Sequence, residues 1–75
     1  MHWQDHIVST PDTLHGTPRF RGTRIAVSIV LENLAAGVSA EELRTQYPTL
    51  PQEAVPAALA YAADLARDRI VPVPT

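Results

Sequence analysis

Residues 19–27 read Arg-Phe-Arg-Gly-Thr-Arg-Ile-Ala-Val, and they divide the chain into two parts of different character. Before this stretch the sequence is rich in turn residues, and after it the apolar residues follow helical spacing almost to the end. Within it, Gly22 and Thr23 interrupt the apolar residues. Because glycine permits positive φ, the stretch predicts two short strands, or a strand and an extended segment, joined by a bend at Gly22.

The same stretch carries three of the six basic residues, in a chain that has no lysine. A bend at Gly22 would bring Arg21 and Arg24 close together on the polar face. Like charges placed side by side repel, so the pair needs solvent or a negative partner. Two interpretations stay open at this point: Asp12 or Glu32 of the same chain supplies that charge, or an external anion or acidic surface does.

Length and composition indicate one small domain. Seventy-five residues bury a limited core, and without cysteine no disulfide can reinforce it. Hydrophobic residues make up 45% of the chain but aromatic ones only 5%, so we expect an aliphatic, alanine-rich core. Helix packing and self-association must then supply the stability, and unpaired edges in the N-terminal segment favour a homodimer.

The net charge of −2 and the isoelectric point of about 5.8 limit how the chain can bind nucleic acid. A protein that binds nucleic acid through its overall charge is usually basic, so this one would need a local patch or a dimer. The longest apolar run, residues 57–63, is far shorter than a membrane span and ends at Asp64. With no signal-peptide pattern at the N-terminus, we expect a cytoplasmic protein without a membrane partner.

No constellation of residues indicates catalysis, a metal or a cofactor. His2 and His6 stand four apart but have no third ligand nearby, so we expect no metal site. Ser9, Asp12 and His15 are the residue types of a hydrolase triad, yet nothing around them marks a nucleophile elbow or an oxyanion hole. We therefore expect a protein that is not an enzyme and uses no cofactor.

Two helices follow the arginine-rich stretch. The first should begin with Ser28 as N-cap, run to Ala36 and end at Gly37, which suits the left-handed residue after a helix. Ser39 and Glu42 have the spacing of a capping box, so a second, short helix is predicted over residues 40–46. Pro48 requires that helix to end at the residue before it.

A corner at residues 48–51 leads to the third helix, which is predicted from Pro51 near its first position to about Arg69. Its predicted apolar stripe consists of Val55, Leu59, Ala62 and Leu65. Pro56 fits this helix poorly unless the helix starts late, because proline lacks the amide that an interior turn needs. Residues 70–75, Ile-Val-Pro-Val-Pro-Thr, cannot be helical and form an extended tail.

The predicted fold class is mostly α. Short β elements in residues 1–27 precede a three-helix core at 28–69 and the tail at 70–75, all in a single domain. A short helix and a long helix joined by a tight corner after a first helix form the helix-turn-helix arrangement, of homeodomain-like or winged type.

The sequence also resembles domain-of-unknown-function family 433, a group of short bacterial and archaeal proteins with a helix-turn-helix-like core. The resemblance extends from Ile7 to about Leu65. Its carriers are Gly16, Pro18, Gly22-Thr23-Arg24-Ile25, Val27, Gly37, Ser39, Glu42, Tyr47-Pro48, Leu50 and residues 57–62.

This resemblance implies an antitoxin of a type II toxin–antitoxin pair. Members of the family are commonly encoded beside a PIN-like nuclease, so the implied partners are that nuclease and operator DNA. The implied action is to hold the nuclease inactive and to repress the operon as a homodimer. Two alternatives stay open: a stand-alone helix-turn-helix DNA-binding regulator, and a small protein-interaction domain without a nucleic-acid role.

Two sets of residues are candidates for these contacts. For DNA they are Arg19, Arg21, Arg24 and Gln52. The arginines suit phosphate, whereas the Gln52 amide can bond adenine or simply cap the third helix in solvent. For the partner protein they are Arg67, Arg69, Ile70, Val71 and Val73, where apolar tail residues stand beside two cations that could reach acidic carboxylates.

Overall fold

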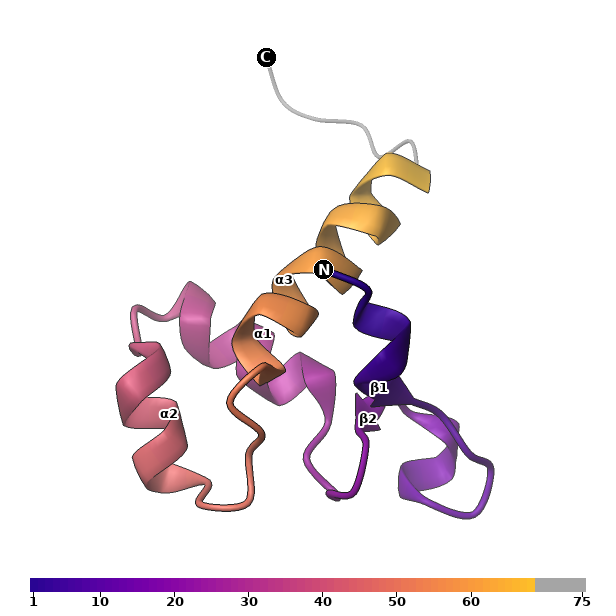
Figure 1. Cartoon of the computed structure of the whole chain (residues 1–75), viewed down its shortest axis with the longest axis horizontal. Coiled ribbons are helices and arrows are strands. Elements are labelled where there is room, and N and C mark those ends of the chain that lie inside the picture. Colours follow the sequence, from indigo (N-terminus) through magenta and orange to yellow (C-terminus); the bar gives the residue numbers. More distant parts are fainter. Residues whose placement is uncertain (69–75) are drawn as a thin grey trace.

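The computed structural model describes residues 1–68, in which three helices pack against a small N-terminal sheet (Figure 1). In chain order the elements are the 3-10 turn η1 (Trp3–Asp5), β1 (Ile7–Val8), the 3-10 turn η2 (Leu14–Gly16), β2 (Arg19–Phe20), α1 (Val27–Ala35), α2 (Ala40–Gln46) and α3 (Ala54–Asp68). The fold is mixed, and short β elements followed by three helices confirm the predicted order. The helix-turn-helix character of the three helices stays a prediction.

The two strands pair antiparallel, with Ile7 opposite Phe20. The chain then bends back, so that the Phe20 amide donates to the carbonyl of Ile25 over 3.1 Å. Gly22 lies at this bend with φ of 79°, a left-handed conformation that favours glycine. A strand and an extended segment joined at Gly22 are therefore confirmed.

Helix α1 begins two residues earlier than predicted, because its N-cap is Ala26 instead of Ser28. The amide of Val27 donates to the carbonyl of Pro18 over 3.0 Å, so α1 begins where the chain leaves its pairing with β2. A backbone hydrogen bond to a residue distant in the sequence thus takes the place of a side-chain cap, and the sequence pattern alone does not reveal it. Ser28 is exposed within the first turn.

The C-terminal end of α1 and the whole of α2 agree with the prediction. Gly37 has φ of 91°, and the amide of Val38 donates to the carbonyl of Asn33 over 3.0 Å, as in a Schellman motif. At the start of α2, the Ser39 hydroxyl oxygen accepts from the Glu42 amide over 3.1 Å. A second hydrogen bond joins the two side chains: the Ser39 hydroxyl donates to the Glu42 carboxylate over 3.1 Å.

Helix α3 begins at Ala54, later than the predicted start near Pro51. Pro56 therefore lies in the first turn, where backbone amides have no partner inside the helix and the missing N–H of proline costs little. This late start removes the conflict that the sequence raised. Arg69 and the tail at residues 70–75 lie outside the described residues.

The buried side of α3 differs from the predicted stripe. Its fully buried residues are Ala54, Ala57 and Ala58, whereas Leu59 and Leu65 are 53% and 39% exposed. The prediction was wrong for Leu59 and Leu65, because the alanine-rich face of the helix packs against the core, whereas Val55 of the predicted stripe does pack against it. The core consists of Ile7, Phe20, Val27, Val30, Leu43, Leu50, Ala54, Ala57 and Ala58.

The C-terminal half of α3 extends beyond α1 and α2 (Figure 1). This part of the helix still contacts η1, which lies against it. Within residues 1–68, no helix is long and apolar enough to cross a membrane.

The capping bond at Ser39 gives a direct test of how α2 is held. We expect Ser39→Ala to lower the free energy of unfolding by about 1 kcal/mol, because the Glu42 amide loses its acceptor. Urea unfolding followed by the fluorescence of Trp3, the only tryptophan, measures this change.

Ser28→Ala is the matched control, since Ser28 is exposed and does not cap α1. It should leave the free energy of unfolding within about 0.5 kcal/mol of the original. Equal losses in the two variants would contradict the assigned caps.

Candidate functional site

The first candidate surface is the loop from Phe20 to Ile25, called here the arginine turn. Its conformation is fixed by Thr23, whose hydroxyl donates to the carbonyl of Phe20 over 2.9 Å. The same hydroxyl oxygen accepts from the Ile25 amide over 3.0 Å. With Phe20 fully buried at its base, the turn presents its side chains from a rigid support.

Arg19 supports this turn from below. Its guanidinium donates to the carbonyl of Thr23 over 3.2 Å and to the hydroxyl of Thr10 over 3.3 Å. Its Nε is buried and has no hydrogen-bond partner among residues 1–68. Arg19 is thus half-buried and connects the arginine turn to the loop before η2, and its predicted contact with DNA stays a prediction.

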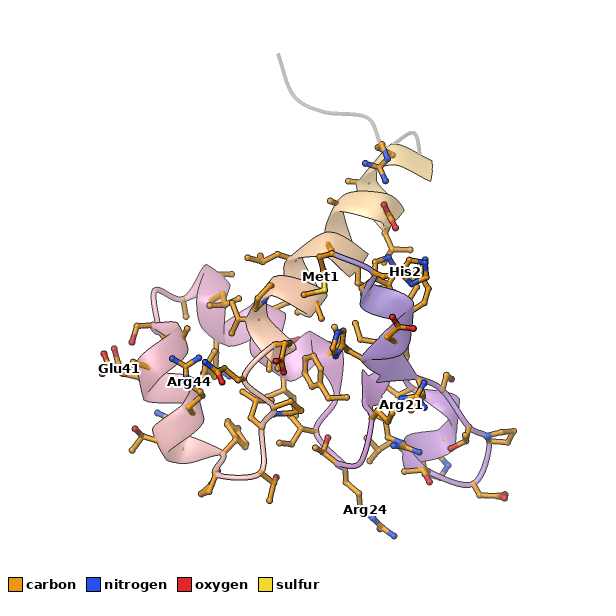
Figure 2. The ribbon with its side chains drawn as sticks, viewed as in Figure 1. Met1, His2, Arg21, Arg24, Glu41 and Arg44 are labelled. Atoms are coloured by element: carbon orange, nitrogen blue, oxygen red, sulfur yellow. The ribbon has the colours of Figure 1, made fainter. Side chains whose placement is uncertain are left out.

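Arg21 and Arg24 are both exposed. Figure 2 shows Arg24 extending outward from the tip of the turn, while Arg21 lies beside the sheet. Among residues 1–67, Asp64 forms an ion pair with Arg67, and the His2 imidazole lies 3.8 Å from the Asp5 carboxylate. The structure therefore places neither Asp12 nor Glu32 in an ion pair with the arginine turn, and both cations face solvent.

Charge is distributed unevenly around this turn. Residues 9–26 hold three arginines and one aspartate, whereas the rest of the chain holds seven of the eight acidic residues. The outer side of α2 carries a shallow hollow lined by Ser39, Glu41, Glu42, Thr45 and Gln46. Glu41 points outward there (Figure 2). An anionic ligand is therefore attracted to the arginine turn and repelled by α2.

The corner before α3 is also acidic. Gln52, the predicted adenine contact, is exposed just before the helix, next to exposed Glu53. A carboxylate beside a base-reading amide opposes the approach of phosphate. The arginine turn, rather than the start of α3, is thus the surface best suited to a nucleic-acid backbone.

The second candidate surface is an apolar groove of about 220 Å³ between α1 and α3, called here the α1–α3 groove. It is lined by Thr17, Pro18, Val27, Ser28, Leu31, Tyr61 and Leu65. Leu65 lies near the C-terminal end of α3 and accounts for much of the exposed apolar surface there.

A cluster around Asp64 fixes the same end of α3. The Trp3 indole donates to the Asp64 carboxylate over 2.5 Å, and its ring packs edge-on against Tyr61 with centroids 5.0 Å apart. Arg67, a predicted partner contact, forms an ion pair with Asp64. The sequence analysis missed this cluster, because no local signal connects Trp3 with a residue 61 positions away.

The remaining predicted partner contacts, Arg69, Ile70, Val71 and Val73, lie outside the described residues. Within residues 1–68, no group of three or more histidine, aspartate or glutamate side chains is arranged to hold a metal ion.

These features define a small domain in which a two-stranded sheet and a rigid arginine turn pack on three helices. The chain belongs to the family described as "Protein of unknown function (DUF433)", which matches residues 7–62. Over 56 residues it is 43% identical to the uncharacterized protein y4eO of Sinorhizobium fredii (strain NBRC 101917 / NGR234). That match spans 75% of this chain but only 25% of the relative. No solved structure matches the chain.

The family membership confirms the resemblance seen in the sequence. The matched residues 7–62 include the arginine turn, α1 and α2, but stop before Asp64 and Leu65. Because the family description states no activity, function has to be argued from the surfaces.

Thr23 provides a test of the arginine turn. We expect Thr23→Val to lower the free energy of unfolding by about 1–2 kcal/mol, because the Ile25 amide and the Phe20 carbonyl each lose a hydrogen bond. Thr49→Val, at an exposed position of the α2–α3 corner, is the matched control and should change it by less than about 0.5 kcal/mol. Urea unfolding measures both, and an unaffected Thr23→Val variant would show that the turn does not depend on this side chain.

Proposed function

We propose that this protein is the antitoxin of a type II toxin–antitoxin pair, which binds and neutralises a PIN-like nuclease and represses its operon by binding operator DNA as a homodimer. Membership of the DUF433 family supports this function, since the family resemblance implies a nuclease partner. The observation that carries the DNA-binding part is the exposed pair Arg21 and Arg24 on a rigid turn, in a chain of net charge −2.

The DNA contact follows from the chemistry of that pair. Arginine binds phosphate through several donors, and contacts to the backbone fix a protein on the duplex without reading its sequence. Two arginines on one protomer give a weak site. A homodimer would present four, which fits a small acidic protein that needs a local basic patch.

The proposed nuclease contact involves the C-terminal end of α3. The active site of a PIN-like nuclease is expected to be acidic, and Arg67 lies in the last turn of α3, two positions before Arg69 in the sequence. In the free protein Arg67 pairs with Asp64, but its side chain is largely exposed. Exposed ion pairs contribute little stability, so Arg67 can exchange Asp64 for a carboxylate of the partner.

The stand-alone DNA-binding regulator is the second candidate, because the arginine turn supports it equally. The two functions differ in the partner protein alone. A neighbouring reading frame for a small protein with separated acidic residues favours the antitoxin.

The DNA contact is tested by the salt dependence of binding to the DNA upstream of the gene. Each phosphate contact contributes about one unit to the slope of log K against log salt, so Arg21→Ala with Arg24→Ala should lower it by about two per protomer. Arg44→Ala is the control, because Arg44 is exposed on α2, outside the arginine turn. It should leave the slope unchanged.

An unchanged slope in the double variant would refute the arginine turn as the DNA contact. An equal decrease in the Arg44→Ala variant would show that general charge, not this turn, governs the binding.

The nuclease contact is tested by co-expression with the product of the neighbouring gene. We expect the two proteins to co-purify and the nuclease to be inactive in the complex. Arg67→Ala should weaken the complex about tenfold, because a charge at an interface loses its partner, whereas Arg44→Ala should not. Calorimetric titration measures both affinities. Failure of the original protein to bind or inhibit the nuclease would contradict the antitoxin function.

A further inference from the structure

We propose that two copies of this chain associate through the exposed side of α3, with the two α3 helices packed antiparallel. This inference rests on the proposed function for the existence of a homodimer, and it adds the interface. It is carried by the apolar character of that side of the helix and by the opposite charges at its two ends.

The side of α3 that faces away from the core is apolar although it is exposed. It consists of Pro56, Leu59, Ala63 and Ala66, called here the outer face of α3, and Leu59 is 53% exposed. When one side of a helix packs on a core, the opposite side is ordinarily polar or charged. An apolar outer face therefore indicates a surface that a partner covers.

The spacing of the outer face is typical of a seam between two helices. Its four residues follow one another at intervals of three, four and three positions, which is the heptad spacing of packed helix pairs. Ala63 and Ala66 allow a second backbone to come close, and Leu59 supplies the largest apolar side chain of the face. The outer face therefore suits another helix.

Glu53 and Arg67 identify that second helix as α3 of another copy. Both side chains are exposed, and each stands seven positions from Ala60 along one edge of the outer face. Glu53 belongs to this helical repeat, because its carbonyl accepts from the Ala57 amide over 3.0 Å. In an antiparallel pair of identical helices centred on Ala60, Glu53 of each copy lies opposite Arg67 of the other.

This charge pattern excludes the parallel arrangement. Parallel helices in the same register would place Glu53 beside Glu53 and Arg67 beside Arg67, and like charges at an interface cost free energy. The antiparallel arrangement instead joins opposite charges at both ends of the contact.

The ion pair of Arg67 with Asp64 is compatible with this contact. A guanidinium has five N–H donors, so Arg67 can bond Asp64 of its own chain and a carboxylate of a second copy. Asp64 is the only charged residue between Glu53 and Arg67 in the sequence. Its carboxylate accepts from the Trp3 indole and so faces η1, away from the outer face.

The length of the contact sets the expected affinity. From Glu53 to Arg67 the helix extends about 21 Å. One helix face from each copy gives a small interface, below about 1,200 Å² in total, which is typical of weak association. Sedimentation equilibrium, with neither nuclease nor DNA present, should therefore give a dissociation constant in the micromolar range. A protein that is monomeric at about 100 μM would overturn the proposal.

Ala63→Gln tests the close approach of the two helices. Glutamine has nearly the helix propensity of alanine, but its longer side chain would hold the helices apart at the seam. We expect the dissociation constant to rise at least about tenfold. Ala35→Gln, at an exposed alanine of α1, is the matched control and should leave it unchanged. Equal dissociation constants for the original protein and Ala63→Gln would overturn the proposal.

Two variants with reversed charges test the antiparallel arrangement. Glu53→Arg would place arginine opposite arginine at both ends of the dimer, and Arg67→Glu would place carboxylate opposite carboxylate. Each variant should bind itself at least about tenfold more weakly than the original protein does. In an equimolar mixture of the two, a heterodimer joins opposite charges at both ends and should exceed its statistical share of the dimers. Native mass spectrometry separates the three dimers by mass.

Arg44→Glu is the control for charge reversal, because Arg44 is exposed on α2, outside the outer face of α3. It should leave self-association unchanged. Unaltered self-association of Glu53→Arg and Arg67→Glu, or a statistical mixture of dimers, would overturn the antiparallel contact. A dimer insensitive to every substitution on α3 would refute this interface and leave the proposed function intact, whereas a nuclease that fails to bind would leave the α3 contact intact.

Discussion

The close approach of α3 to the core, through Ala54, Ala57 and Ala58, is the constraint on which the other surfaces depend. These three side chains are almost completely buried, so the backbone of α3 lies nearer to its neighbours than larger residues would permit. A larger side chain there would overpack the core and push the helix outward. Because the alanine side faces inward, Leu59 and Leu65 are left partly exposed. The α1–α3 groove is thus a consequence of how the core closes.

In the arginine turn, neighbouring residues have separate structural roles. Phe20 anchors the turn in the core, Thr23 fixes its backbone, and Arg19 fills its underside with a half-buried guanidinium. Arg21 and Arg24 at its surface form no ion pair with a carboxylate among residues 1–67. A rigid support lowers the entropy that is lost when these side chains bind an anion. Because the acidic side of α2 repels an anion, the arginine turn is the surface that an anion approaches most favourably. The position of the cations therefore matters more than the negative net charge.

Local signals predicted the parts of the fold that local chemistry controls. The capping box of Ser39 and Glu42 predicted the start of α2, and Pro48 predicted its end. Gly37 and Gly22 marked the end of α1 and the bend of the arginine turn. Features that arise from distant contacts were not predictable. The start of α1 depends on pairing with Pro18, and the buried side of α3 depends on which face fits the core. Leu14 and His15 adopt left-handed φ of 52° and 54° although neither is glycine, so their sequence carries no sign of it.

Asp64 connects these surfaces, since its carboxylate accepts from the Trp3 indole and pairs with Arg67. The N-terminal turn η1 thereby holds the part of α3 that precedes the C-terminal segment. Trp3 also packs on Tyr61, which lines the α1–α3 groove, so the groove and the Asp64 cluster share one wall. Trp3, Asp64, Leu65 and Arg67 all lie outside the family match at residues 7–62, whereas the arginine turn lies inside it. We therefore expect the choice of protein partner to depend on this end of α3, and a backbone-type anion contact to depend on the turn.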